Sequence, residues 1–320
     1  MMVGEQHRRH RPRVGKAVII LGAAIVAALT AKVCGAPPEA ASCSATKTTK
    51  HQVDLPINLK STGGRPILIE WPSGVLVVNY EPGRERVLGS LTVVGEADVA
   101  ANAVGACDSV RFEVVQPTRP GGAVRLLVKS PRNQRGCRVQ LTGQIVLPSG
   151  TPLTIEAKHG TVRVFASDAP LEIRSENADV TVQDAVRRVK IRTRNGDVKL
   201  VAPADEVSIE NDHGDVFVEL TNSNSVVGKI DVKCKAGMID AMLSPEISAT
   251  IDPSTMRGRV LRFERESPAR WTAGVIDPWA DPLKLGAGER PVSLNSQCGN
   301  VSLRVDQPAT AVASQPAEGD

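Results

Sequence analysis

Aromatic residues are scarce in this chain, since 320 residues include only three Trp, one Tyr and four Phe. Proteins that bind single-stranded nucleic acid combine a basic groove with aromatic side chains on which bases stack. Residues 1–16 hold five of the 39 Lys and Arg and one of the 35 Asp and Glu, so the remainder has 34 of each and no net charge. We therefore predict no nucleic-acid partner.

Familiar catalytic motifs are also missing. The sequence has no HExxH or CxxC motif, and no Ser lies in a nucleophile elbow. No long segment after residue 36 has the apolar spacing of a helix, so the rest of the chain is expected to be all-β. We predict that the protein is not an enzyme and has no cofactor.

The long uncharged run of the sequence lies near its N-terminus, at residues 17–31, after five basic residues. This order is typical of an export signal. Fifteen helical residues span about 22 Å, which is less than a hydrocarbon core of about 30 Å. We predict that residues 1–36 are a signal peptide or an N-terminal membrane anchor. Residues 37 onward are then exported, either membrane-anchored or periplasmic or extracellular.

One apolar pattern recurs four times at a spacing of 18 residues. The copies LTIEAKHGTVRV, LEIRSENADVTV, VKIRTRNGDVKL and VSIENDHGDVFV begin at Leu153, Leu171, Val189 and Val207. Each copy contains two apolar-x-apolar pairs that start nine residues apart, which is typical of two short strands buried on one side. A small residue lies between the pairs, where the turn needs it: Gly160, Ala178, Gly196 and Gly214.

This repeat predicts a right-handed parallel β-solenoid with 18-residue, two-strand coils. One coil buries about four aliphatic side chains at roughly 1.5 to 3 kcal/mol each. Ordering each of its 18 residues costs about 1 to 2 kcal/mol in backbone entropy. A single coil therefore cannot fold alone and needs its neighbours to complete the core. Related segments begin at Ile67, Ile230 and Val292. We predict the following domains: a linker at 37–60, the solenoid at 61–306 with a hairpin insertion at 85–147 and a loop or cap at 252–290, and a disordered tail at 307–320.

The passage VQLTGQIVLPSGTPLTIEAKHGTVRV, followed by LEIRSENADVTV and VKIRTRNGDVKL, resembles a bacterial family of candidate adhesins. These are β-strand-repeat domains related to auto-transporter adhesin heads. The likeness covers residues 137–220 well and residues 65–305 loosely. It implies a β-solenoid on an exported, often envelope-anchored protein, and it implies no catalytic residues.

Three aspartates share one position of the repeat, directly after the turn residue: Asp179, Asp197 and Asp215. If they stack about 4.8 Å apart, a calcium ion would relieve their repulsion. The alternative is that each Asp stabilises its own turn. His159 and His213 share the preceding position but lie three coils apart, too far to share a metal ion or a proton.

Two other groups of residues are candidate sites. Phe263, Trp271 and Trp279 lie in the segment 252–290 and are candidates for binding a partner, because loops on rigid scaffolds carry function. Four cysteines of an exported chain are candidates for disulfides, in the pairs Cys107 with Cys137 and Cys234 with Cys298.

We therefore expect a non-enzymatic, exported, cell-envelope β-solenoid that acts as an adhesin-like binding or envelope-organising scaffold. Its partner would be an envelope or surface component, protein or polysaccharide, with the membrane reached through the N-terminal segment. The alternative is a polysaccharide-acting β-helix enzyme, a lyase or hydrolase, that uses Arg174, Arg192, Arg194 and Lys199. A self-assembling structural protein is a third hypothesis.

Overall fold

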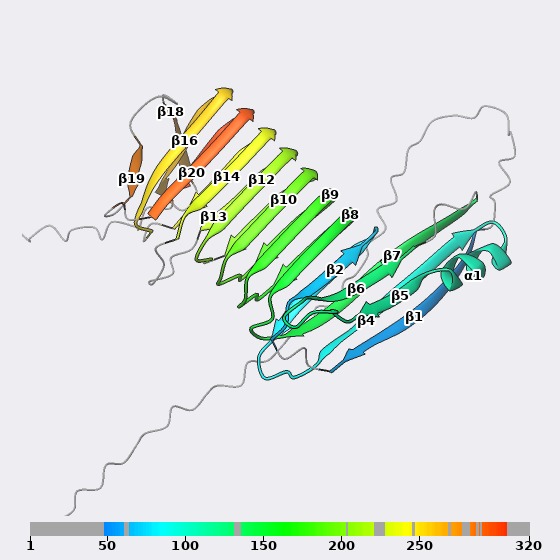
Figure 1. The fold of residues 1–320 in the computed structure, drawn as a ribbon. Helices are drawn as coiled ribbons and strands as arrows, with labels where there is room; N and C mark the ends of the chain where they lie inside the picture. Colours follow the sequence, from blue (N-terminus) through cyan, green and yellow to red (C-terminus); the bar gives the residue numbers. More distant parts are fainter. Residues whose placement is uncertain are drawn as a thin grey trace, which may run out of the picture. The chain divides into compact units, whose positions relative to one another are not determined.

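The computed structural model describes residues 48–60, 64–130, 136–202, 204–220, 228–244, 247–267, 270–276, 282–285, 288 and 290–305. These residues form a 21-stranded, mostly parallel sheet and one short helix, α1 (Ala100–Asp108) (Figure 1). The prediction of an all-β protein is confirmed. No helix of the described part is long and apolar enough to cross a membrane. The predicted signal or anchor at 1–36 lies outside the described residues.

The parallel strands form two rows. In spatial order, the first row contains β6 (Val124–Lys129), β2 (Ile67–Trp71), β8 (Leu153–Phe165), β9 (Leu171–Gln183), β10 (Val189–Asn195), β12 (Val207–His213), β14 (Ile230–Ala236), β20 (Arg290–Cys298) and β16 (Ala249–Arg257). The second row contains β7 (Cys137–Pro148), β3 (Val75–Glu81), the later halves of β8 and β9, β11 (Val198–Ala202), β13 (Val216–Leu220), β15 (Ile239–Leu243), β21 (Val301–Val305) and β17 (Val260–Ser267).

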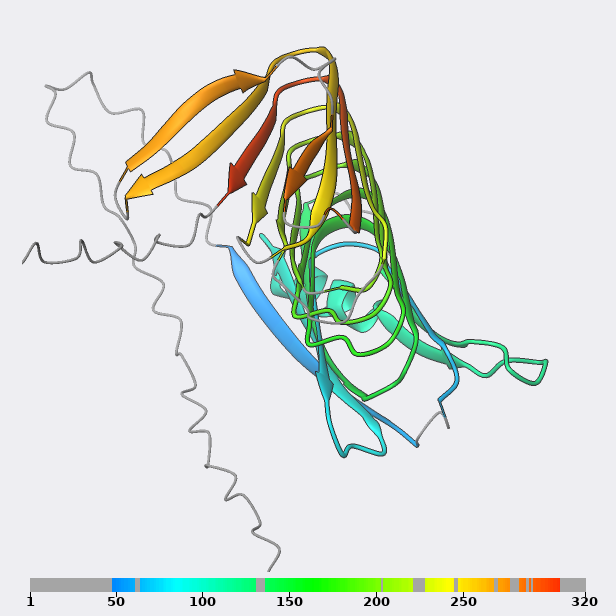
Figure 2. The same ribbon diagram turned by 90° about the vertical axis from the view of Figure 1, so that its left-hand side faces the viewer.

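We call a first-row strand and the second-row strand that follows it in the chain a layer. Figure 2 views the layers nearly end-on, so that their turns superimpose. The pairing register matches the sequence repeat, because Leu171 pairs with Leu153 and with Val189, which pairs in turn with Val207. The more distant copies fit the same register, since Ile67 pairs with Leu153 and Ile230 pairs with both Val207 and Val292.

The core lies between the two rows. The apolar residues of each apolar-x-apolar pair point inward and are almost fully buried, as for Ile173 and Val180 of β9. A column of small polar residues is buried beside the turns: Ser175, Thr193, Asn211, Ser296 and Thr255. Their side chains bond to one another or donate to turn carbonyls, so these carbonyls have hydrogen-bond partners.

The turn glycines adopt a positive φ, which glycine tolerates far better than other residues. Gly160, Gly196 and Gly214 have φ of 109°, 126° and 121°. Stacking adds a second constraint, because a Cβ on Gly214 would lie 2.3 Å from the carbonyl oxygen of Gly196 in the next layer. Ala178 takes the same place in β9 without a positive φ.

The N-terminal part corrects two boundaries. Residues 49–59 of the predicted linker form strand β1 (Thr49–Leu59), which pairs antiparallel with β4 (Val87–Ala97). Within the segment predicted as a hairpin insertion, β5 (Arg111–Val115) pairs antiparallel with β6. The segment 85–147 also contains β4, helix α1 and β7, and β4 pairs antiparallel with β7.

The C-terminal part corrects the predicted loop at 252–290. This segment holds most of β16, all of β17, and the short strands β18 (Arg270–Ile276) and β19 (Leu283–Leu285), which pair antiparallel with β17 and β16. The last strands of the chain, β20 and β21, lie between the layer of β14 and β15 and the layer of β16 and β17 (Figure 1).

Two residues suit this arrangement. Pro253 of β16 has no N–H to donate to a further strand, and an edge position tolerates Pro. Besides β20, the one strand of the described residues that pairs with β16 is β19, at Ala249–Ile251. Arg290 of β20 is buried, and its guanidinium donates to the carbonyls of Gly228 (2.9 Å), Asp205 (3.2 Å) and Ala204. These contacts hold β20 against the layers that precede it.

Candidate binding surface and pocket

The outer side of the first row is densely charged. Alternate residues of a strand point to opposite faces, so the residues between the buried apolar positions of β8, β9, β10, β12 and β14 all point outward. We call this surface the charged face; its residues in ion pairs include Glu156, Glu172, Arg174, Lys190, Arg192, Glu210, Asp231 and Lys233. In parallel register, each layer places its charges directly beside those of the next.

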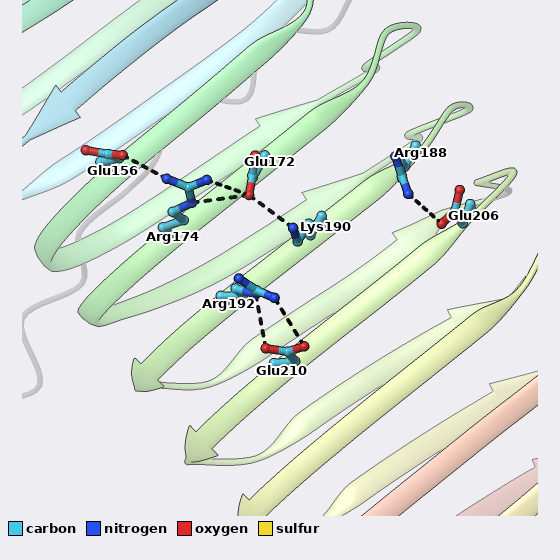
Figure 3. A network of polar contacts seen from close by, with 8 residues as sticks. All are labelled: Glu156, Glu172, Arg174, Arg188, Lys190, Arg192, Glu206 and Glu210. Atoms are coloured by element: carbon cyan, nitrogen blue, oxygen red, sulfur yellow. Dashed lines mark hydrogen bonds and ion pairs between the residues drawn. The ribbon is translucent and has the colours of Figure 1, made fainter.

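Most of these charges are paired with each other across or within layers (Figure 3). Arg174 contacts Glu156 at 3.2 Å and Glu172 at 3.0 Å, and Lys190 lies 3.5 Å from Glu172. Arg192 binds Glu210 with two of its nitrogens, at 3.0 and 3.5 Å. The charged face is therefore a lattice of ion pairs open to solvent.

The pKa of Glu172 shows the effect of this pairing. Partial burial by itself raises the pKa of this carboxyl, but hydrogen bonds and charges from Arg174 and Lys190 outweigh it, and the pKa lies below its ordinary value. The carboxylate is thus held ionised at neutral pH. A general acid needs the opposite shift, because its pKa should lie near the working pH.

Three of the four residues of the enzyme hypothesis lie together on β9 and β10, where Arg174 pairs with Arg192, and the fourth, Lys199, lies elsewhere. Arg174 and Arg192 are held in ion pairs on the charged face, and Arg194 lies on the same strand as Arg192. Lys199 belongs to β11 in the second row, where its ammonium lies 5.4 Å from the centre of the Phe217 ring.

The aspartates of the repeat accept hydrogen bonds from the next layer. An oxygen of Asp179 accepts from the backbone N–H of Asp197 (3.0 Å), Asp197 accepts from Asp215 (2.8 Å), and Asp215 accepts from Met238 (2.8 Å). Among the residues that the structure describes, no group of three or more His, Cys, Asp or Glu could hold a metal ion. The observed bonds stabilise the turns, and a calcium site at these three residues stays a prediction.

The two histidines are placed as expected from the repeat. His159 pairs with Asn177, Asn177 with Asn195, and Asn195 with His213, so three steps of the sheet separate them. Asn195 donates to Asn177 at 2.7 Å, and His213 lies 3.3 Å from the carbonyl oxygen of Arg194. The residues of this column therefore form hydrogen bonds with one another and with the adjacent main chain.

The four described cysteines are free thiols. Cys234 is buried in the polar column and Cys298 is exposed in the turn, although their strands β14 and β20 are neighbours. Cys107 of α1 is buried and lies close to Gly95 of β4, while Cys137 begins β7. The two disulfides stay predictions.

The predicted partner-binding residues are only partly described. Phe263 is half-buried in β17, and the Arg304 guanidinium lies 5.9 Å from its ring centre. The backbone of Trp271 lies in β18 opposite Arg265, and Trp279 lies outside the described residues. Their role in binding a partner stays a prediction.

The sequence did not reveal a pocket of about 320 Å³ at one end of the charged face. Its walls come from four strands and the turn after β2: Glu70, Trp71, Pro72, Val128, Glu156, Ala157, Lys158, Arg174, Ser175 and Glu176. Trp71 was a signal for this place, because it occupies the repeat position of Ala157 and Ser175 and is far larger than either.

Comparisons with solved structures found several similar chains of low sequence identity. A candidate cell adhesion protein from Clostridium sporogenes is 12% identical, with 82% of this chain and 100% of that chain covered and a TM-score of 0.31. A candidate adhesin from Bacteroides fragilis is 16% identical, covering 80% of this chain and 98% of that chain (TM-score 0.35). A candidate lipid-binding protein from Parabacteroides distasonis is 10% identical, covering 79% and 96% (TM-score 0.26). No family model and no curated protein matches the sequence.

Proposed function

We propose that this protein is a non-enzymatic, exported scaffold of the cell envelope, whose right-handed solenoid of 18-residue coils presents the charged face to an envelope component. The observation that carries the proposal is the pairing of acid and base on this face. Ion pairs between neighbouring layers fix long side chains in rows, so a partner meets an ordered surface and less side-chain entropy is lost on binding. The basic and then apolar N-terminal sequence supports export.

The ion pairs of the charged face also favour a binding role over a catalytic one. A lyase or hydrolase needs a side chain free to take or give a proton in the working pH range. On the charged face, Arg174 and Arg192 are engaged by carboxylates, and Glu172 has a lowered pKa. The described residues support a surface that recognises a partner through its charges.

The test is co-sedimentation of the purified protein with isolated cell envelopes, with and without calcium. We expect the wild type to sediment and the double variant Lys190→Ala with Arg192→Ala to be retained several-fold less. The matched control is Arg163→Ala with Lys199→Ala, which removes the same charge from the second row. A wild type that stays in solution, or an equal loss for both double variants, contradicts the proposal.

A further inference from the structure

The pocket exists because β6 leaves β2 before β2 ends. The two strands pair only as far as Glu70 with Leu127, while β2 continues beside β8 to Trp71 with Ala157. The next residue of β6, Val128, has no partner in β2, although β6 stays paired with β5 along its other edge, where Val128 lies opposite Phe112. The divergence opens the pocket of about 320 Å³ beside the end of β2, a size within the range of small-ligand sites.

The floor and the walls of the pocket have different chemistry. Trp71, Ala157 and Ser175 are buried, so the main chain at these positions forms the floor. The residues before and after these three positions point outward and form the walls of the pocket, which are charged except at Pro72. Glu70 is bonded to Arg125, and Arg174 to Glu156, so these charges are already balanced.

Two lining residues keep their charge free. Lys158 and Glu176 occupy equivalent positions in β8 and β9, directly before the paired residues His159 and Asn177. Both are exposed, and neither forms an ion pair within the described residues. The indole ring of Trp71 lies in the core against Gly143 of β7, where its N–H is a buried donor without a hydrogen-bond partner among the described residues.

We propose that this pocket binds a neutral saccharide unit of an envelope polysaccharide, an inference that rests on the proposed scaffold function. A hydroxyl group both donates and accepts, so a sugar can donate to the Glu176 carboxylate and accept from the Lys158 ammonium. The acids Glu70, Glu156 and Glu176 are matched by the bases Arg125, Arg174 and Lys158, so this place has no net charge to attract a strongly anionic or a strongly cationic ligand. A neutral polyhydroxyl ligand needs no such attraction.

The experiment is titration calorimetry of the full chain with three tetrasaccharides: neutral maltotetraose, neutral chitotetraose and anionic tetragalacturonate. At least one neutral probe should bind more tightly than the anionic one. Lys158→Ala and Glu176→Gln should each weaken it by about tenfold, the loss of one charge-assisted hydrogen bond. Lys235→Ala is the matched control, because Lys235 lies in the same column outside the pocket and pairs with Asp212 at 2.6 Å; it should leave affinity unchanged.

Three outcomes overturn the saccharide site: no neutral probe binds at millimolar concentration, the anionic probe binds best, or Lys235→Ala loses as much affinity as Lys158→Ala. Envelope sedimentation of the same proteins separates this proposal from the broader one. If the wild type sediments but no probe binds, the saccharide site is wrong and the scaffold function stands. If the wild type fails to sediment, the scaffold function is wrong.

Discussion

At the scale of single residues, the turns between the two rows are held by side chains that are small or form specific hydrogen bonds. Asn211 donates to the carbonyls of Gly196 (3.2 Å) and Gly214 (2.9 Å), so one amide joins two layers. The Asp residues on the outer side of the turns accept main-chain N–H groups. Each turn is therefore bound to the next from both sides.

Gly214→Ala tests the stacking of the turns. The new Cβ would sit 2.3 Å from the Gly196 carbonyl oxygen at a φ of 121°, so both a clash and backbone strain follow. We expect the free energy of unfolding to fall by about 2 to 5 kcal/mol. Gly150→Ala is the matched control, since its φ is 74° but nothing lies within 4 Å, and it should cost about 1 kcal/mol. Equal losses in urea unfolding would show that stacking plays no part.

Cys234 gives a prediction about pH. Burial, and then the charge of Asp215, raise its pKa from 9.0 to about 11. The folded state therefore holds this proton more tightly than the unfolded state. Its contribution to stability is complete below pH 9 and is lost as the pH rises towards 11.

The measurement is urea unfolding at pH 8 and pH 10.5. Cys234→Ser should lose less stability between the two values than the wild type, because Ser does not ionise in this range. Ser already stands at the equivalent positions 175 and 296. At pH 8, mass spectrometry should also find Cys298 alkylated before Cys234. An identical pH dependence of the two proteins would contradict the assignment.

At the scale of strands, the sequence predicted the layers wherever two apolar pairs start nine residues apart. It missed β1, because TKHQVDLPINL contains Pro56 and many polar residues and buries only Ile57 fully. It missed the terminal layer, because Pro253 stands at a buried apolar position of β16. Apart from Trp71 at a repeat position otherwise held by small residues, the sequence gives no sign of the pocket, since it depends on where β6 departs from β2, a tertiary feature that periodicity does not encode.

Arg290→Met tests what holds the inserted strand β20. The substitution keeps an apolar stem but removes the donors to the carbonyls of Ala204, Asp205 and Gly228. Buried carbonyls left without donors are costly, and we expect a loss of about 2 to 4 kcal/mol in the free energy of unfolding. The control is Arg304→Met on the neighbouring strand β21, whose side chain is exposed and pairs with Asp240 at 2.8 Å. A smaller loss for Arg290→Met than for Arg304→Met would contradict the anchoring role.

At the scale of the whole sheet, the ion pairs of the charged face order a surface more than they stabilise a fold. The side chains of Arg192 and Glu210 are 49% and 46% exposed, so water screens their attraction. A double-mutant cycle with Arg192→Ala and Glu210→Ala should give a coupling of about 0.2 to 1 kcal/mol that shrinks in high salt. A salt-independent coupling well above this range would show that the face contributes mainly to stability.

The most direct test of the central claim is to incubate the protein with insoluble envelope polysaccharide and to measure bound protein and soluble sugar in the same sample. We predict that the protein is retained on the polysaccharide and that soluble sugar stays at the level of a protein-free sample. Release of sugar above that level, abolished by Arg174→Ala or Arg192→Ala, would contradict the account and show that the charged face is catalytic.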